Sequence, residues 1–431
     1  MNLNKIIFAL FLMFSHCAYT QTPEELVNAI HLDPTNCLAR FSLGNMYAQQ
    51  QNYIEAIEQF NEILKIRPHI TSVLYNAAYC LKALGHFEDA IKRYNNVLML
   101  QPDHGDARHG LSQAQLMLGN YEQAWENFEY RWSKPRSDSR AFVQYIHSGA
   151  SLHNKTVLLL CEFGLGDTFQ FIRYAQKVKE LGARVIVQAQ KPVIPILSLC
   201  PYIDQIVPVD TDIPAHDLAT ALMSLPFAFT TTIDTIPNSM PYLCADQKLI
   251  EYWKDHLKED PAFAQDYGGR GKSFKIGICW NGNEYDQKVL QDLVHAKSIP
   301  LTYFESLSAI KSVSLYSLQK TSGTNQLKTI NFKIHTFDEN FDDSQGRFMD
   351  TAAVMKNMDL IITVDTSIAH LAGGLGVPVW LMLPHIPDWR WMIDGTTSPW
   401  YPTMKLFRQA KTGDWQSVME EVKMALQQLI K

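Results

Sequence analysis

Small, apolar and aromatic residues along the first third of the chain follow a helical spacing that recurs every 34 residues. Prolines mark this period at Pro34, Pro68 and Pro102. The same shift superimposes Tyr53, Phe87 and Tyr121, then Ala56, Ala90 and Ala124, and then Phe60, Tyr94 and Phe128. Small residues let paired helices approach, aromatic residues fill the space between pairs, and proline ends a helix. The pattern predicts stacked helical hairpins over residues 1–135.

From residue 156 onward, short apolar runs alternate with amphipathic segments. The runs that we predict as strands are 156–163, 183–190, 203–210, 274–280, 312–319, 359–365 and 377–383. This alternation is typical of parallel sheets with helices on both faces. The sequence therefore predicts two Rossmann-like halves, at 150–265 and 272–431, with a proline-punctuated and then polar stretch at 228–270 as a hinge.

The composition excludes several classes of protein. The 431 residues include 38 Lys plus Arg and 44 Asp plus Glu, a net charge of −6, whereas nucleic-acid binding needs a strongly basic face. The seven cysteines form no Cys-x-x-Cys pair, which disfavours a zinc knuckle and a secreted disulfide framework. The triplet Asp210-Thr211-Asp212 follows a predicted strand, and we interpret it as a surface loop. We expect no metal site.

Residues 1–20 have two interpretations. Residues 6–14 are apolar and precede a weak small-x-small site, as in a secretory signal peptide, and they are too short to span a bilayer. Stepping the repeat back by 34 residues instead makes 6–14 the first helix of a degenerate repeat and 24–30 its second helix. The polar residues 133–139 are interpreted as a linker.

The first motif with candidate chemistry is Gly164-Leu165-Gly166-Asp167, which follows a predicted strand and opens a helix. Gly164 and Gly166 let a substrate approach the backbone closely. Asp167 lies at the helix N-terminus, where backbone donors hold a carboxylate ionised, so it could accept a proton from a hydroxyl. The alternative is that Asp167 only caps its helix. The dinucleotide fingerprint is not met because Phe169 stands in the place of its third glycine.

The second motif runs from Asp365 to His370, again at the end of a predicted strand and the start of a helix. The hydroxyls of Thr366 and Ser367, with the first amide groups of the helix, form a candidate diphosphate site. His370 shares a helix face with Thr366 because the two are four residues apart. The alternative is a helix cap beside a core histidine.

Further candidates lie near the ends of the second series of strands. Asn281 and Asn283 follow the run 274–280, and Lys297 and Lys320 could neutralise a charged leaving group. Lysines on loops are also commonly solvated. The stretch at 387–391, PDWRW, could stack a nucleobase or sugar, or serve only in packing.

These motifs resemble known families. The 34-residue pattern resembles the tetratricopeptide repeat. Residues 156–410 resemble the glycosyltransferase half of bacterial tetratricopeptide-repeat glycosyltransferases, which are related to the family 9 ADP-heptose–lipopolysaccharide heptosyltransferases. The stretches that carry this second resemblance include GLGDTFQFIRYAQ, HDLATALMSLPFAF, SLQK, VDTSIAHLAGGLG and DWRW with SPWYP. The resemblance implies a helical solenoid followed by an α/β GT-B fold of two Rossmann-like halves.

The same resemblance implies roles for the candidate residues. Asp167 corresponds to the proposed base. The residues that correspond to contacts with the diphosphate and sugar are Asp365, Thr366, Ser367 and His370, and those that correspond to phosphate contacts are Asn281, Asn283 and Lys297. Lys297 stands where such proteins usually carry Arg, and the segment 284–296 looks lengthened. Lys does not reproduce the bidentate fork of Arg.

The expected function is metal-independent transfer of a sugar from a nucleotide diphosphate sugar to an acceptor hydroxyl on a protein or a surface glycan. The nucleotide sugar would be a substrate, and no cofactor is expected. The repeats would hold a protein partner or acceptor, or only support the neighbouring domain. The alternative function is a repeat scaffold with an inactive GT-B module. We expect a cytoplasmic location because nucleotide sugars are made there, and an exported one if residues 1–20 are cleaved.

Overall fold

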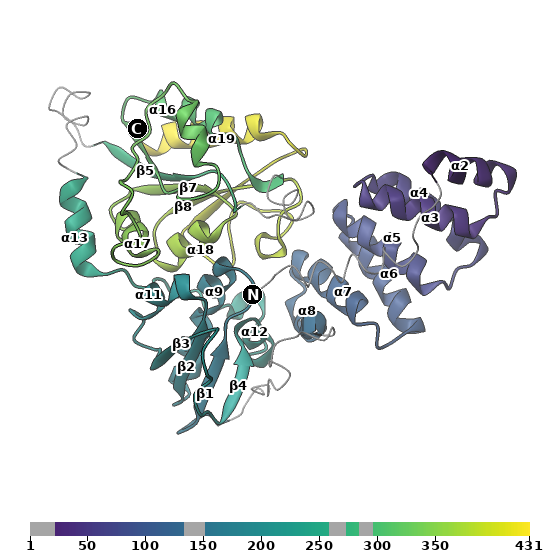
Figure 1. Cartoon of the computed structure of the whole chain (residues 1–431), viewed down its shortest axis with the longest axis horizontal. Helices are drawn as coiled ribbons and strands as arrows, with labels where there is room; N and C mark the ends of the chain where they lie inside the picture. The colour runs from purple at the N-terminus through teal and green to yellow at the C-terminus, as the bar shows by residue number, and fades with distance from the viewer. Residues whose placement is uncertain (1–21, 133–150, 258–272, 284–295) are drawn as a thin grey trace. The chain divides into compact units, whose positions relative to one another are not determined.

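The structure is a computed structural model that describes residues 22–132, 151–257, 273–283 and 296–431 (Figure 1). The candidate leader or helix at 6–14, the linker at 133–139 and nearly all of the lengthened segment at 284–296 lie outside the described residues. The contacts divide the chain into two units. Unit 1 holds the repeats together with Thr230–Ile233 and Ile386–Asp394, and unit 2 holds the two α/β halves.

Unit 1 contains the predicted helical hairpins. Its helices are α2 (Pro23–Leu32), α3 (Cys37–Gln49), α4 (Tyr53–Ile66), α5 (Thr71–Ala83), α6 (Phe87–Leu100), α7 (Gly105–Met117), α8 (Tyr121–Phe128) and the 3-10 helix η1 (Glu129–Trp132). Helices α2, α4 and α6 each end two residues before one of the periodic prolines. The predicted period therefore corresponds to one hairpin per repeat, and α2 matches the second helix expected at 24–30.

The periodic residues form the core of the repeats. The alanines at 56, 90 and 124 are fully buried, as are the aromatic residues at 60 and 94. A Cβ at Gly44 would lie 2.7 Å from the Phe60 ring, and one at Gly110 would lie 2.5 Å from the Tyr94 ring. Small and aromatic positions are therefore matched across neighbouring helices, which is the packing that the repeat pattern predicts.

The two short segments that join unit 1 pack against its last repeats. Trp125 donates its indole N–H to the Thr231 carbonyl at 2.8 Å. The Trp389 ring, in the 3-10 helix η7 (Trp389–Trp391), lies 5.8 Å from the rings of both Trp125 and Phe128. A Cβ at Gly85 would meet Ile386 at 2.7 Å. The PDWRW stretch was expected either to stack on a nucleobase or sugar or to serve in packing. In the structure, Trp389 packs against the repeats.

Unit 2 begins with a four-stranded parallel sheet. Its strands are β1 (Thr156–Leu160), β2 (Arg184–Ala189), β3 (Gln205–Pro208) and β4 (Leu218–Ala221), in the order β3-β2-β1-β4. The first three were predicted from their apolar runs, whereas β4 was not. The order reverses between β1 and β4, so the topological switch point of this sheet lies at their carboxyl ends.

The second sheet of unit 2 has five parallel strands. They are β5 (Phe274–Cys279), β6 (Val313–Ser317), β7 (Leu360–Val364), β8 (Val379–Leu383) and β9 (Met404–Arg408), in the order β6-β5-β7-β8-β9. Only β9 lies outside the predicted runs. The order reverses between β5 and β7, which places the switch point at the end of the strand before Asp365. Two parallel sheets after a helical solenoid confirm the predicted fold class.

Helices cover both faces of the second sheet (Figure 1). The terminal helix α19 (Trp415–Leu429) and α16 (Glu305–Ser308) lie on one face, where Val418, Val422 and Leu307 join the core with Ile276 and Ile278. The opposite face carries α17 (Met349–Met355) and α18 (Ser367–Gly374). The core thereby fixes the strand ends from which the candidate motifs project.

The remaining elements of unit 2 are short. They are α9 (Leu165–Phe171), α10 (Arg173–Glu180), η2 (Lys191–Val193), α11 (Ile194–Leu197), η3 (Leu222–Ser224), α12 (Leu225–Ala228), η4 (Ile233–Thr235), whose first residue belongs to unit 1, α13 (Gln247–His256), η5 (Leu301–Phe304) and η6 (Thr324–Lys328). Among the described residues, we find no helix with the length and apolar character needed to cross a membrane.

Candidate functional site

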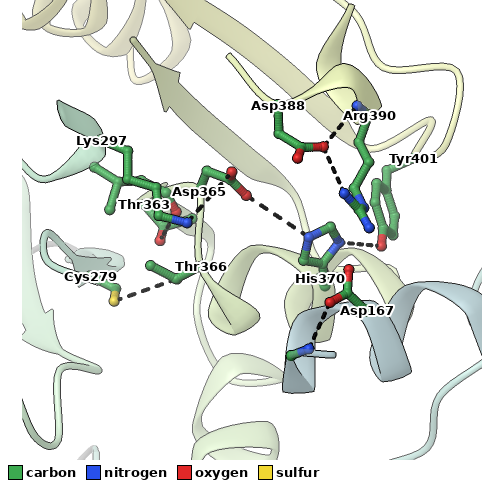
Figure 2. Close-up of polar contacts among 12 residues, drawn as sticks. Asp167, Cys279, Lys297, Thr363, Asp365, Thr366, His370, Asp388, Arg390 and Tyr401 are labelled. Atoms are coloured by element: carbon green, nitrogen blue, oxygen red, sulfur yellow. Dashed lines mark hydrogen bonds and ion pairs between the residues drawn. The ribbon is translucent and has the colours of Figure 1, made fainter. Parts of the chain in front are cut away.

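Helix α18 starts at the switch point of the second sheet. Its N-cap, Thr366, is extended (φ −140°, ψ 174°), and its side chain makes no capping hydrogen bond. The Thr366 hydroxyl instead lies 3.8 Å from the Sγ of Cys279, at the end of β5 (Figure 2). The first amide groups of a helix have no intrahelical acceptor, and the helix dipole favours an anion there. Thr366 and Ser367 therefore flank a position suited to phosphate oxygens.

Charged side chains surround this helix start. The Asp365 carboxylate lies 3.8 Å from the Nζ of Lys297 and 3.9 Å from the Nε2 of His370 (Figure 2). Lys297 keeps 32 % of its side chain exposed, against 14 % for Asp365. At these separations neither contact is a tight hydrogen bond, and Lys297 and Asp365 form a loose ion pair. The structure thus brings three of the predicted donor-binding residues into one cluster.

His370 has a fixed orientation. The ring is 4 % exposed, and its Nδ1 lies 2.7 Å from the hydroxyl of Tyr401, which is fully buried. The hydrogen bond at Nδ1 fixes the ring plane and leaves Nε2 on the side of Asp365. Tyr401 was not among the predicted site residues. Its only signal in the sequence was its place in the SPWYP stretch, which carried part of the resemblance.

The first motif forms the start of α9, beyond the end of β1. Asp167 accepts a hydrogen bond at 2.8 Å from the backbone N–H of Gly164, the N-cap of this helix. Asp167 is half-buried and Gly164 is exposed. The preceding residue, Phe163, has φ 51°, a strained conformation for a bulky side chain. The structure therefore shows the capping role of Asp167, and it does not test the role as a base.

Gly166 brings the two motifs together. A Cβ on this residue would lie 2.8 Å from the Cδ2 of His370 and 3.5 Å from the Cα of Ser367. Any side chain here would displace the histidine ring or separate the two helices. The starts of α9 and α18 are therefore in contact, and the switch points of the two sheets meet there. Sequence spacing alone could not give this contact, which joins residues about 200 positions apart.

Gln319 organises the loop after β5 and was not predicted as a site residue. Its Oε1 accepts from the backbone N–H groups of Trp280 and Asn281 at 3.1 and 3.0 Å, and its Nε2 donates to the Asn281 carbonyl at 3.0 Å. The Asn281 side chain donates to the Gly282 carbonyl at 2.8 Å. The Asn283 side chain accepts from the Thr321 hydroxyl at 3.0 Å. Both asparagines thus shape this loop.

Lys320 and Asp210 make contacts elsewhere in unit 2. The ammonium of Lys320 pairs with Asp343 at 2.9 Å and also donates to the Phe341 carbonyl. In the part of the chain that the structure describes, its contacts lead to this turn rather than to Asp365. Asp210, in the DxD triplet, is exposed and pairs with Lys191 at 2.8 Å, in agreement with a surface loop. Among the described residues, no group of three or more His, Cys, Asp or Glu side chains is placed to hold a metal ion.

Burial also controls the ionisation of the Cys279 thiol, which lies beside the start of α18. Cys279 is almost fully buried, and desolvation raises its pKa from 9.0 to about 11. Its Sγ contacts the Gln319 amide at 3.2 Å as well as Thr366. The thiol is therefore neutral at physiological pH and acts as a packing group under α18.

Comparison with known proteins supports the repeat part directly. Residues 37–70 and 81–126 match models of the tetratricopeptide repeat, so the N-terminal part of the chain consists of such repeats. Over nearly its whole length the chain is similar to protein FlbA of Caulobacter vibrioides. The identity is 22 % over 438 residues, which cover 94 % of this chain and 69 % of that protein.

Solved structures resemble parts of the chain. The crystal structure of MamA is similar over 26 % of this chain and 65 % of its own, with 19 % identity and a TM-score of 0.25. A family 9 glycosyl transferase from Veillonella parvula is similar over 65 % of this chain and 98 % of its own, with 12 % identity and a TM-score of 0.46. Both TM-scores are below 0.5, and the fold follows from the chain's own strand order.

Proposed function

We propose that this protein is a glycosyltransferase that moves a sugar from a nucleotide diphosphate sugar to an acceptor hydroxyl on a protein or a surface glycan. The observation that carries the proposal is the contact of Gly166 with His370. It joins the switch points of two parallel sheets, and ligands of such sheets bind outside the carboxyl ends of the strands at these points. One half would present the acceptor and the other the donor.

The donor would bind at the start of α18. Amide groups of the helix start, with the hydroxyls of Thr366 and Ser367, would donate hydrogen bonds to the diphosphate. The Lys297 ammonium would neutralise part of the charge that grows on the leaving nucleoside diphosphate as the bond from the sugar to phosphate breaks. Such a site supplies cationic and dipolar stabilisation from the protein itself, so we propose a reaction that needs no metal ion.

Asp167 would act as the base. Its carboxylate is held at the start of α9 by the Gly164 N–H, and it directly follows Gly166, the residue of α9 that approaches His370 and Ser367 of α18. In the proposed step, the acceptor oxygen forms a bond to the anomeric carbon and its proton passes to Asp167. The electron pair of the breaking bond leaves with the diphosphate, so charge and atoms balance.

The repeats would supply a partner or acceptor surface. Tetratricopeptide repeats stack into solenoids whose faces bind other proteins. A protein held by unit 1 would be tethered to the chain that carries the transferase half, and the resulting high local concentration raises the rate of modification without new contacts at the active site. Because nucleotide sugars are made in the cytoplasm, we propose that the reaction takes place there.

Calorimetric titration of a panel of nucleotide sugars into the full chain tests the donor site. We expect one donor to bind with micromolar affinity, about −8 kcal/mol, and to bind at least about tenfold more weakly to Thr366→Ala and to His370→Ala. Thr329→Ala is a matched control, because the exposed Thr329 hydroxyl donates to the Gln326 carbonyl within a turn of the same half, its one hydrogen bond among the described residues. Equal affinity in all four proteins would refute the assignment of the site.

One observation favours the alternative of an inactive scaffold. The side chains of Asn281 and Asn283 already form hydrogen bonds within the loops after β5 and β6, although phosphate contacts were expected from them. If the folded chain binds no member of the panel, the donor site is absent and the repeats carry the function. Mass-spectrometric identification of proteins crosslinked to unit 1 in the native host would then name the partner.

A further inference from the structure

Two cysteines that are far apart in the sequence meet inside unit 2. Cys200 lies just after α11 and is 3 % exposed, whereas Cys244 is half-buried, and both thiols are reduced. The Cys200 thiol donates a hydrogen bond to the sulfur of Cys244. The Sγ of Cys200 also lies 3.9 Å from the Tyr242 carbonyl oxygen, which accepts from the Tyr202 hydroxyl at 2.7 Å. A disulfide bond of about 2 Å requires sulfur atoms that are already close, and these contacts supply that condition.

The two thiols differ in acidity and in exposure. The hydrogen bond from Cys200 lowers the pKa of the Cys244 thiol below its usual value of 9.0, although burial acts in the opposite direction. The same hydrogen bond, together with burial, raises the pKa of Cys200. The thiolate is the species that attacks an oxidant, and it must also be accessible. Cys244 therefore has both properties of an attacking thiol, and Cys200 is a buried thiol placed to react with its oxidation product.

The residues just before Cys244 hold the end of α18. The backbone N–H groups of Tyr242 and Leu243 both donate to the carbonyl of Gly374, the last residue of this helix, at 3.0 Å. The Tyr242 hydroxyl accepts from the guanidinium of Arg173 at 2.9 Å, and Arg173 is only 2 % exposed. Residues 242–244 therefore form a buried connection between α18 and the turn after α11, and a covalent bond at Cys244 would fix this connection.

We propose that Cys200 and Cys244 form a reversible redox site, at which a peroxide converts the two thiols into a disulfide. The Cys244 sulfur attacks one peroxide oxygen and the O–O bond breaks, which gives a sulfenic acid and, after protonation of the leaving oxygen, water. The Cys200 sulfur then attacks the Cys244 sulfur, and the sulfenic hydroxyl leaves as a second water. Two thiols and one hydrogen peroxide thus give one disulfide and two waters. A dithiol reductant reverses the step and becomes a disulfide itself.

The disulfide would act on α18 from the end opposite to the candidate donor site. It would fasten residues 242–244, whose amide groups hold the Gly374 carbonyl, to the turn after α11. Oxidation would therefore restrict the opening of this segment and stabilise the helix whose start is proposed to bind the diphosphate. Any effect on donor binding rests on the proposed function, but formation of the disulfide does not.

Peptide mapping of the full chain after treatment with hydrogen peroxide tests the disulfide. We expect one pair of peptides joined through Cys200 and Cys244, and we expect dithiothreitol to separate them. Cys37→Ser is the matched control, because Cys37 is also half-buried but lies in the repeats, and it should form the same joined pair. In Cys200→Ser we expect a sulfenic acid at Cys244, detected as its dimedone adduct. Absence of the joined pair from the folded native chain, or a random mixture of joined cysteines, would overturn the proposal whether or not the variants fold.

Hydrogen exchange of backbone amides tests the effect of the disulfide on residues 242–244. We expect the amide hydrogens of Tyr242 and Leu243 to exchange about tenfold more slowly in the oxidised chain than in the reduced chain, because the bond limits local opening. The amide of Ser417, which donates to the Asp414 side chain at the start of α19, is the internal control and should exchange equally in both states. Equal rates for Tyr242 and Leu243 in the two states would refute the fastening. Neither measurement uses a nucleotide sugar, so failure of the proposed function remains distinguishable.

Discussion

The starts of α9 and α18 have the same architecture and opposite chemistry. Each follows a strand that borders a topological switch point, and the two helices meet at Gly166 and His370. The start of α9 carries its own carboxylate, Asp167, which accepts from the Gly164 N–H. The start of α18 has no side-chain cap and has Lys297 beside it. Asp167 thus supplies an anion inside the first turn of α9, whereas the carboxylate nearest the start of α18, Asp365, precedes the N-cap and is paired with Lys297. The first amide groups of α18 therefore remain suited to an external anion.

In the proposed reaction, this difference would suit the two helix starts to different substrates. A diphosphate would be repelled by Asp167, and a neutral hydroxyl would gain little from the dipole of α18. In the proposed reaction, the residue at the third position of each helix, Asp167 in α9 and Ala369 in α18, would separate the acceptor role from the donor role. The following experiments test the comparison, beginning with the largest expected effect.

Asp167→Asn tests the chemistry of α9. The amide oxygen of asparagine can still accept from the Gly164 N–H, so the helix cap is retained while the base is lost. We expect turnover to fall by about 10²–10⁴-fold with donor affinity unchanged, measured by rate assays and calorimetry. Asp246→Asn is the control, because Asp246 caps α13 by the same kind of bond to Leu249. Full turnover in Asp167→Asn would assign the carboxylate a capping role alone.

Because the Cys279 thiol beside the start of α18 is buried, we expect the free energy of unfolding to depend on pH. Burial raises the pKa of Cys279 from 9.0 to about 11, so the folded state favours the neutral thiol. This contribution, up to about 2–3 kcal/mol, is fully present below pH 9 and is lost as the pH rises through about 11. We expect the free energy of unfolding of the native chain, relative to Cys279→Ala, to fall across this interval in denaturant titrations. A constant difference would mean that solvent reaches the underside of α18.

Gly166→Ala tests the contact between the two helix starts. Alanine favours a helix, but its Cβ would lie 2.8 Å from the His370 ring, which Tyr401 holds in place. We expect a loss of about 1–3 kcal/mol in the free energy of unfolding, together with weaker donor binding. Gly44→Ala imposes a similar clash, 2.7 Å from Phe60, inside the repeats. It should destabilise unit 1 and leave donor affinity unchanged, so loss of affinity in both variants would contradict a local effect.

Most of the fold could be predicted from the sequence because it depends on local patterns. The period of 34 residues gave the repeats, and uninterrupted apolar runs gave the buried strands. Strand β4 was missed because Leu218–Ala221 has only one large apolar residue, beside two alanines and a threonine, and so lacks a run of large apolar side chains. Strand β9 was missed because Met404–Arg408 lies at the edge of its sheet and alternates exposed Lys405 with buried neighbours.

From the sequence, we could predict only those residues of the candidate site that lie where a strand is followed by a helix. Asp167 and the residues from Asp365 to His370 follow apolar runs, so their place at strand ends could be inferred. Arg173 appeared to be an ordinary residue of an amphipathic helix, and its burial depends on carbonyls more than 60 and 200 positions away. The contacts of Tyr401 and Gln319 likewise join separate loops. Such long-range contacts leave no periodic signal in the sequence.

The two predicted lysines offer the finest test of the comparison. Lys297 lies beside Asp365 at the start of α18, whereas Lys320 is engaged by Asp343 and the Phe341 carbonyl. We expect Lys297→Met to weaken donor binding about tenfold, roughly 1.4 kcal/mol, and to reduce its dependence on ionic strength. Lys320→Met removes the same charge from the same half and should have a smaller effect. If both variants lose affinity equally in calorimetry at low and high salt, the attraction is a property of the whole half, and the start of α18 is not a distinct anion site.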